Sequence, residues 1–324
     1  MRRIHPFVLV IFTALLLVLV AGCSINQIAV NALANALAGG EGDEGSVFTA
    51  DDDPELVGDA LPFALKLYET ILEQTPEHEE LLLATGSGFV SYANAFVATP
   101  ASMLPFEEWD RREAMQARAK RLYLRGREYL VRGLEARYAG FREALFDADR
   151  QAVFAYLGRM RRDDVPFLYW IGASWVAAFA LDPFDLDLAF TVTRAEPLML
   201  RALDLHEEFN DGAIHDFLVQ YYAGLPDSMG GDKAKAEYHH ARALEIAAGR
   251  LAGPYVSYAE AVVIPRQDVD LFVDLMNRAL AVDPDDHPAA RLINILTQRK
   301  ARWYLQNIED FFLLDWPEDE GEEF

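Results

Sequence analysis

The stretch that decides the fold is residues 64–89, ALKLYETILEQTPEHEELLLATGSGF. Its first half carries small, aromatic and apolar residues at helical spacing, and then a proline that ends the element: Ala64-x3-Tyr68-x2-Ile71-x4-Pro76. Its second half resumes the helical spacing six residues later: Leu82-x2-Thr85-Gly86-x2-Phe89. Small residues let two helices lie close together, while larger side chains fill the grooves between them. The stretch therefore predicts two helices packed as a hairpin.

The same frame returns further along the chain. One copy lies near the other end, as Phe272-x3-Met276-x2-Ala279-x4-Pro284 followed by Ala290-x2-Ile293-Asn294-x2-Thr297. Two weaker copies lie between, Ala195-x3-Met199-x2-Ala202 and Ala236-x3-His240-x2-Ala243. This frame is typical of tetratricopeptide repeats, although no copy matches the full consensus and insertions break a strict period. Four phased copies, with no alternation of period two, predict an all-α array of degenerate tetratricopeptide-like hairpins, an α-α superhelix.

Other helices are predicted from capping and composition. Asp53-Pro54-Glu55 is typical of a helix start, and Gly230-Gly231-Asp232 predicts a turn and cap before a helix from Lys235 to Ala248. Glu107–Tyr138 has no proline and is rich in helix formers. Val165–Leu181 is apolar all round, so we expect it to be buried on every side or to line an apolar cavity. It is short for a membrane span, and we do not interpret it as one.

The first residues have the features of a secretory signal: basic Arg2 and Arg3, an apolar run over 7–20, and small residues before Cys23. The end of the run resembles the lipobox of bacterial lipoproteins, which implies cleavage before Cys23 and its lipidation by acyl chains such as palmitate. Ser24 follows instead of the aspartate that retains Gram-negative lipoproteins in the inner membrane, so we expect the outer membrane. The alternatives are an uncleaved membrane helix or an ordinary cleaved signal. Cys23 is the only cysteine, which excludes an intrachain disulfide.

These patterns divide the chain into five parts. We predict a lipoprotein signal peptide over 1–22, an N-terminal anchor helix over 23–40, an acidic linker over 41–52, a helical domain over 53–314 and an acidic tail over 315–324. The anchor helix is predicted from apolar residues at spacings of three and four, ending at a glycine pair: Ile25, Ile28, Ala29, Ala32, Leu33, Ala36, Leu37 and Gly39-Gly40.

Charge and composition limit the possible partners. The chain has 29 basic and 52 acidic residues and a formal net charge of −23, and removal of the signal takes away two basic residues and no acid. Such a surface repels phosphate backbones and anionic lipid, so we expect no nucleic acid partner and membrane contact through the lipid anchor only. Hydrophobic residues make up 52% of the chain, which is enough for a substantial core.

No pattern of residues predicts catalysis, a metal or a cofactor. Gly86-Ser87-Gly88 lacks the preceding strand and the lysine of a phosphate loop. His239 and His240 diverge by about 100° on a helix and cannot easily share one ion. We therefore interpret the seven histidines as surface polar residues. No nucleophile and base stand together, so we predict a protein that is not an enzyme.

The remaining candidates are aromatic side chains in apolar helical segments. Aromatic residues at helical spacing are usually core, but Tyr and Trp also line apolar clefts, where they offer large area and a polar group. Both interpretations stay open for the ligand-cavity candidates Tyr92, Phe96, Phe167, Tyr169, Trp170, Trp175, Tyr222 and Tyr258.

An ordered set of short stretches carries a resemblance to a known family. The stretches are Asp52-Asp53-Pro54-Glu55-Leu56, Leu61-Pro62-Phe63, Leu81-Leu82-Leu83-Ala84, Leu122-Tyr123-Leu124-Arg125, Tyr169-Trp170-x4-Trp175, Gly230-Gly231-Asp232-Lys233-Ala234-x-Ala236, Arg291-Leu292-Ile293-Asn294-Ile295-Leu296 and Ala301-Arg302-Trp303. In this order, over roughly Cys23 to Leu313, the chain resembles the T component of tripartite ATP-independent periplasmic (TRAP) transporters.

The resemblance implies a lipid-anchored periplasmic protein at the inner leaflet of the outer membrane. It also implies a homotrimer that associates with the P component, the solute-binding protein of the transporter, and that passes a small, hydrophobic solute to it. The alternative is a general outer-membrane repeat lipoprotein that scaffolds envelope protein assembly and has no solute of its own.

Overall fold

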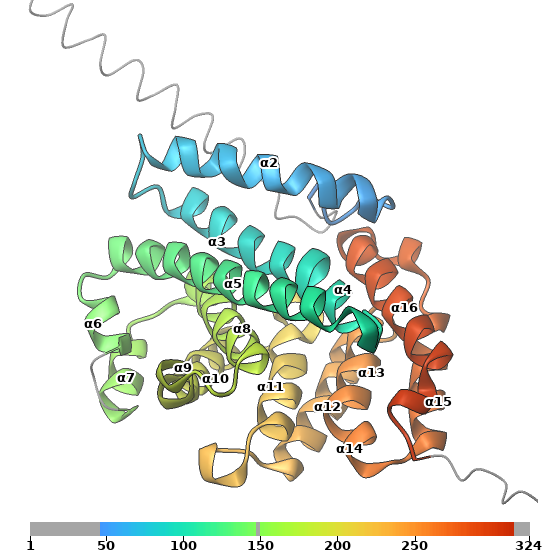
Figure 1. Ribbon diagram of the computed structural model, residues 1–324. Helices are drawn as coiled ribbons and strands as arrows, with labels where there is room; N and C mark the ends of the chain where they lie inside the picture. The colour runs from blue at the N-terminus through green and yellow to red at the C-terminus, as the bar shows by residue number, and fades with distance from the viewer. Residues whose placement is uncertain (1–45, 147–149, 314–324) are drawn as a thin grey trace, which may run out of the picture.

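The computed structural model describes residues 46–146 and 150–313 of the chain (Figure 1). The predicted signal peptide, Cys23, the predicted anchor helix over 23–40 and the acidic tail over 315–324 lie outside the described residues. Every regular element in the described ranges is a helix, so the all-α prediction is confirmed. The assignment of the hairpins to tetratricopeptide repeats stays a prediction.

The helices form a stack whose most extensive contacts join α3 to α5, α5 to α8, α11 to α12, and α8 to α10 (Figure 1). The last helix returns to the first, because α16 also packs on α2. The bounds are α2 Pro54–Leu72, α3 Glu79–Ala93, α4 Thr99–Ser102, α5 Trp109–Arg137, α6 Phe141–Phe146, α7 Arg150–Leu157, α8 Val165–Leu181, α9 Leu186–Thr191, α10 Ala195–Leu205, α11 Ala213–Gly224, α12 Lys233–Ala247, α13 Gly253–Tyr258, α14 Ile264–Arg266, α15 Val269–Ala281 and α16 Arg291–Gln306. Two π turns, Asn94–Ala98 and Ala259–Val263, continue α3 into α4 and α13 into α14.

The predicted helix starts are present, with small differences in their bounds. The Asp53 carboxylate accepts a hydrogen bond from the Leu56 backbone N–H at 3.0 Å and caps α2. Asp232 caps α12, as predicted. This helix spans Lys233–Ala247, so it begins two residues before Lys235, where the sequence predicted its start. The long helix α5 begins at Trp109 instead of residue 107, because Phe106–Glu108 forms a separate 3-10 turn.

The hairpin predicted from residues 64–89 is formed by α2 and α3. The small residue Gly86 serves close packing, as predicted, although its contact is with α5. A Cβ atom on Gly86 would lie 2.8 Å from the carbonyl oxygen of Gly126, and a Cβ on Gly126 would lie 2.7 Å from the carbonyl oxygen of Gly86. These two glycines therefore allow the backbones of α3 and α5 to touch.

Gly126→Ala is expected to lower the free energy of unfolding by about 1–3 kcal/mol, because the added methyl forces α3 and α5 apart. Urea denaturation followed by circular dichroism would measure the loss. Gly224→Ala, at the end of α11, is the matched control, since a Cβ there meets no atom within 4 Å. Equal stability of the two variants would contradict the close crossing.

The helix α8 lies at the centre of the stack, between α5 and α10 (Figure 1). Its bounds, Val165–Leu181, are those predicted. Of the two predicted alternatives, burial on every side is excluded, because Tyr169, Trp170, Ala173 and Ala177 are only half-buried, and lining of an apolar cavity stays a prediction. The helix thus has a core side and a half-buried side.

Two helical segments are long and apolar enough to cross a membrane by length and composition, Glu79–Ser102 and Arg162–Leu181. Half of each apolar window is buried inside the protein. Core helices of soluble proteins meet the same criterion.

The interpretation of the histidines as surface residues is wrong for two of them. His215 on α11 and His239 on α12 are buried, and their Nδ1 atoms lie 2.8 Å apart. The His215 Nε2 atom lies 3.2 Å from a carboxylate oxygen of Glu207. Burial lowers the pKa of both imidazoles. The physical reason for the error is that each histidine finds its partner on the neighbouring helix, which the spacing within one helix does not reveal.

Candidate functional site

The core side of α8 holds two of the predicted aromatic residues, Phe167 and Trp175, which are both buried. The Trp175 indole Nε1–H donates to the Thr191 hydroxyl at 3.1 Å, and its ring packs at 5.3 Å from the Phe146 ring. The Arg127 guanidinium lies 4.5 Å from the Trp175 ring, and burial lowers the pKa of Arg127 to about 10. These contacts make Trp175 part of the core.

The half-buried side of α8 presents Tyr169 and Trp170 together. Their ring centroids lie 5.1 Å apart, and the Tyr169 ring also packs at 5.3 Å from Phe209. Burial, with the nearby charge of Asp216, raises the pKa of the Tyr169 phenol. Tyr169 therefore links this aromatic pair to an acidic group.

Asp216 on α11 is the acidic group, and its hydrogen bonding is incomplete. Its Oδ2 lies 2.9 Å from the Ser257 hydroxyl, which is also 2.8 Å from the carbonyl oxygen of Gly253. The hydroxyl has one proton, so both contacts are hydrogen bonds only when Asp216 is protonated and donates to Ser257. The Asp216 Oδ1 is buried and has no hydrogen-bond partner.

The protonation of Asp216 changes close to neutral pH. Burial raises the pKa of Asp216 to about 6, donation by the Ser257 hydroxyl to the ionised carboxylate opposes this shift, and the charge of Glu260 adds to it. A titratable group with an unsatisfied oxygen near an aromatic side chain, here Tyr169, can recognise a polar group on an otherwise apolar molecule. We therefore define the candidate site as Tyr169, Trp170, Phe209, Asp216 and Ser257.

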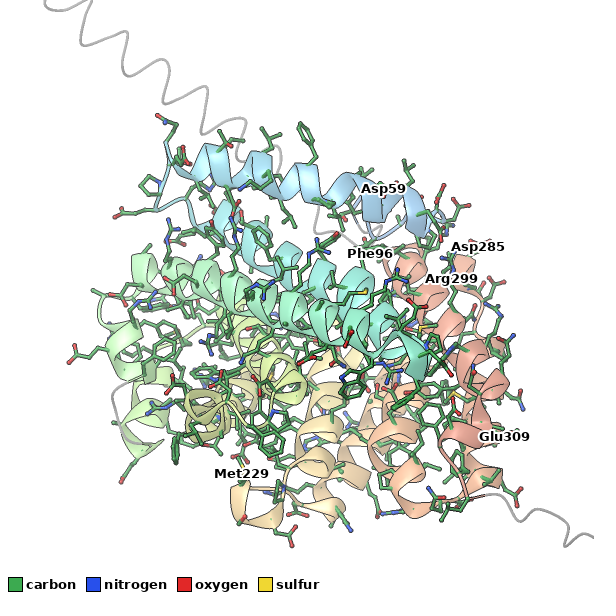
Figure 2. The ribbon with its side chains drawn as sticks, viewed as in Figure 1. Asp59, Phe96, Met229, Asp285, Arg299 and Glu309 are labelled. Carbon is green, nitrogen blue, oxygen red and sulfur yellow. The ribbon has the colours of Figure 1, made fainter. Side chains whose placement is uncertain are left out.

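The other predicted aromatic residues lie elsewhere in the stack. Tyr92 and Phe96 stack on each other at 5.8 Å, and Phe96 faces Gly58 of α2 (Figure 2). The Tyr222 hydroxyl donates to Glu196 at 2.8 Å, and the Tyr222 ring stacks on His239. The Tyr258 ring stacks on His240. The structure therefore places the eight candidates at several sites instead of along one wall.

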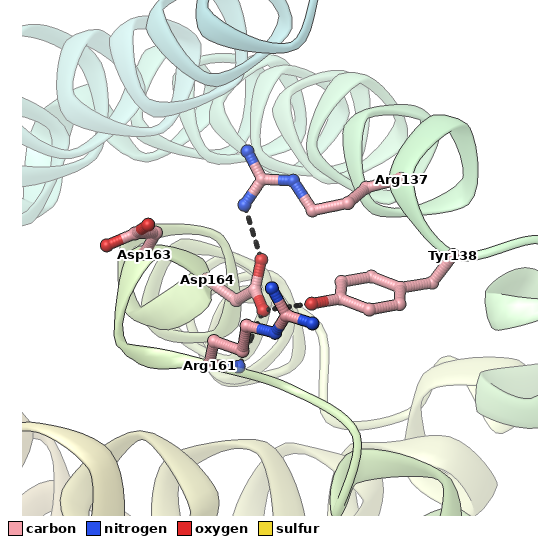
Figure 3. Close-up of a pocket in the computed structure, with 5 residues that line it drawn as sticks. All are labelled: Arg137, Tyr138, Arg161, Asp163 and Asp164. Carbon is pink, nitrogen blue, oxygen red and sulfur yellow. Dashed lines mark hydrogen bonds and ion pairs between the residues drawn. The ribbon is translucent and has the colours of Figure 1, made fainter.

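A pocket of about 320 Å³ opens where the end of α5 meets the start of α8 (Figure 3). It contains none of the eight aromatic candidates and is lined by Arg137, Tyr138, Arg161, Asp163 and Asp164.

The buried Asp164 carboxylate holds this junction together. Its Oδ1 accepts from the Arg137 guanidinium, and its Oδ2 accepts from the Tyr138 hydroxyl and from the Arg161 backbone N–H, each at 2.7 Å. Both carboxylate oxygens of Asp164 accept hydrogen bonds from the protein itself, so we interpret this pocket as a structural contact between α5 and α8 and not as a binding site. Local sequence patterns do not predict this pocket, because Tyr138 and Asp164 are 26 residues apart in the chain.

Asp164→Asn is expected to lower the free energy of unfolding by about 1–2 kcal/mol, because the amide cannot accept from all three donors and carries no charge for Arg137. Thermal unfolding would measure this loss. The exposed neighbour Asp163 provides the control as Asp163→Asn, and a loss of equal size there would contradict the role given to Asp164.

Within residues 46–146 and 150–313, no group of three or more His, Cys, Asp or Glu side chains is placed to hold a metal ion.

Comparison with known proteins identifies the family. The family described as TRAP transporter T-component matches residues 50–312, which include the whole candidate site. An uncharacterized protein of Treponema pallidum (strain Nichols) is 38% identical over 320 residues, which cover 95% of this chain and 99% of that protein. The chain therefore belongs to the T-component family of TRAP transporters.

Proposed function

We propose that this T component binds the P component of its transporter and contacts the solute through Tyr169, Trp170 and Asp216. Its family supports an accessory role in a TRAP transporter. The observation that carries the solute proposal is the half-buried aromatic pair Tyr169 and Trp170, of which Tyr169 lies near Asp216, a residue whose Oδ1 lacks a hydrogen-bond partner. The solute class is a small, largely hydrophobic molecule with one group that can donate a hydrogen bond to this oxygen.

The solute contact can be tested with Nile red, an apolar fluorescent probe, titrated into the purified protein. Trp170→Ala is expected to weaken probe binding about tenfold, which corresponds to about 1.4 kcal/mol. Tyr92→Ala is the matched control, because Tyr92 is also half-buried and ring-stacked but lies outside the candidate site. Equal effects of the two variants would contradict the site.

The partner can be tested separately by measuring binding of the purified P component of the same transporter to the immobilised T component. Saturable binding of the P component to both the wild type and Trp170→Ala would support the P component as the partner. The solute contact is then tested by the Nile red titration alone. Absence of binding with and without solute would contradict the partner, and would favour the alternative role as a scaffold. Sedimentation equilibrium tests the homotrimer that we propose for the protein.

We further propose that Cys23 is acylated and anchors the protein in the outer membrane, facing the periplasm. Cys23→Ser is expected to abolish incorporation of labelled palmitate, because the thiol is the only one in the chain. Ser24→Asp is the control that keeps the thiol, and we expect it to stay acylated but to fractionate with the inner membrane. Label in Cys23→Ser would contradict the anchor.

A further inference from the structure

The outer face of α2 carries an exposed apolar stripe. Leu56, Phe63 and Leu67 are 59%, 76% and 37% exposed, and Ala60 between them is also exposed. Their spacing of four, three and four residues places them on one side of the helix. The buried residues Val57, Leu65 and Leu72 lie on the opposite side. Figure 2 shows side chains of α2 pointing away from the rest of the protein.

This stripe is unusual for the end of a helical stack. α2 packs on α3 and on α16, and it is the outermost helix at this end of the described structure (Figure 1). Terminal elements of helical arrays normally present a polar outer face to water. An apolar outer face on α2 therefore indicates that a further apolar element covers it.

The chain before α2 is fixed beside the start of this stripe. The carbonyl oxygen of Thr49 accepts from the Leu292 backbone N–H at 3.0 Å, and that of Ala50 accepts from Arg291 at 3.0 Å. Asp53 then caps α2. Any segment before residue 46 thus approaches α2 at its Leu56 end.

Residues 25–37 match the stripe in length and character. This segment has no charged residue in a strongly acidic chain, and its apolar residues recur at helical spacing. A helix over 25–37 would be about 18 Å long, and the stripe from Leu56 to Leu67 is about 17 Å long. Residues 38–45, which include Gly39 and Gly40, can span up to about 26 Å and so allow the chain to reverse.

We propose that residues 25–37 form a helix that lies antiparallel on the outer face of α2 and caps the stack. Leu37 then packs beside Leu56, Leu33 beside Ala60, and Ile25 beside Leu67. This arrangement is independent of the solute and the P component. It places Cys23 at the Leu67 end of α2, and so fixes which end of the stack is next to the lipid anchor.

Disulfide trapping tests the arrangement, because Cys23→Ser leaves a chain without cysteine. The full mature chain would be exported behind a signal peptide that lacks a lipobox, and oxidised with copper phenanthroline. We expect the pairs Leu37→Cys with Leu56→Cys and Leu33→Cys with Ala60→Cys to form intramolecular disulfides in most molecules. The control pair Leu37→Cys with Leu67→Cys joins opposite ends of the stripe and should stay reduced.

Each other outcome would overturn the proposal. Disulfide-linked dimers would mean that a second copy covers the stripe. Bonding of the control pair would mean a parallel arrangement. Free thiols in all pairs, with Phe63→Cys shielded from maleimide only by phosphatidylethanolamine vesicles, would mean that the stripe contacts lipid.

Hydrogen exchange gives a second measurement that needs no disulfide. Amides of residues 25–37 should be protected in the mature wild-type protein, and Phe63→Asp should remove that protection. Phe63 is exposed among the described residues, so this variant is expected to keep the stack folded. Identical exchange of the segment in the two proteins would contradict the proposal.

Discussion

Trp175→Ala is expected to lower the free energy of unfolding by about 3–5 kcal/mol, because it empties the largest fully buried side chain in the described structure. The variant also loses the hydrogen bond to Thr191 and the ring that faces the Arg127 guanidinium. Arg127 already has a buried Nη1 without a hydrogen-bond partner, so the cavity would remove one of its remaining favourable contacts. Urea denaturation followed by far-ultraviolet circular dichroism would measure the loss.

The loss in Trp175→Ala should be compared with the loss of unfolding free energy in Trp170→Ala, on the same helix. Trp170 is half-buried, so we expect a smaller loss, of about 1–2 kcal/mol, together with the loss of probe binding described above. If Trp170→Ala destabilises the protein as much as Trp175→Ala does, the division of α8 into a core side and a solute side is wrong.

The helices could be predicted from the sequence because their signals are local. The spacing in residues 64–89, the cap at Asp53 and the apolar run of α8 each depend on a few neighbouring residues. The sequence could not predict which side of α8 is buried in the core, since a helix that is apolar all round has no preferred face. Only the packing of α5 and α10 against α8 separates the buried Trp175 from the half-buried Trp170.

The polar part of the candidate site could not be predicted for a different reason. Asp216 and Ser257 lie on separate helices and are 41 residues apart in the chain. His215 and His239 also lie on separate helices and are 24 residues apart. Local patterns cannot pair residues at such separations. The one available signal was the pair of polar residues His215-Asp216 inside an otherwise apolar helical segment, which marks polar groups that must find partners in the interior.

Asp216→Asn is expected to stabilise the protein at neutral pH, by up to about 3 kcal/mol. The pKa of Asp216 is raised by burial from 3.8 to about 6. Between these values the unfolded chain has lost a proton that the native protein still holds, so this group makes stability fall as the pH rises from about 4 to 6. The asparagine is neutral throughout, and its amide can donate to Ser257 as the protonated acid does.

The quantity to measure is the difference in unfolding free energy between variant and wild type at each pH. The wild-type curve alone would mix opposite trends, because burial lowers the pKa of His239 and His240 to about 4, and such groups make stability fall as the pH falls below 6.5. We expect the difference to be small at pH 4 and to reach its full size above pH 6. Asp286→Asn, at an exposed acid, should give a flat difference.

A flat difference for Asp216→Asn as well would mean that Asp216 is not held in an environment that opposes its charge. The expected rise with pH in the difference of unfolding free energy has a functional consequence. It means that an ionised Asp216 reduces the stability of the wild-type protein at the pH where the protein would work. A group that reduces stability in this way is typical of a binding site. A solute that donates to the Asp216 Oδ1 would satisfy that oxygen, and should therefore stabilise the wild-type protein more than the Asp216→Asn variant above pH 6.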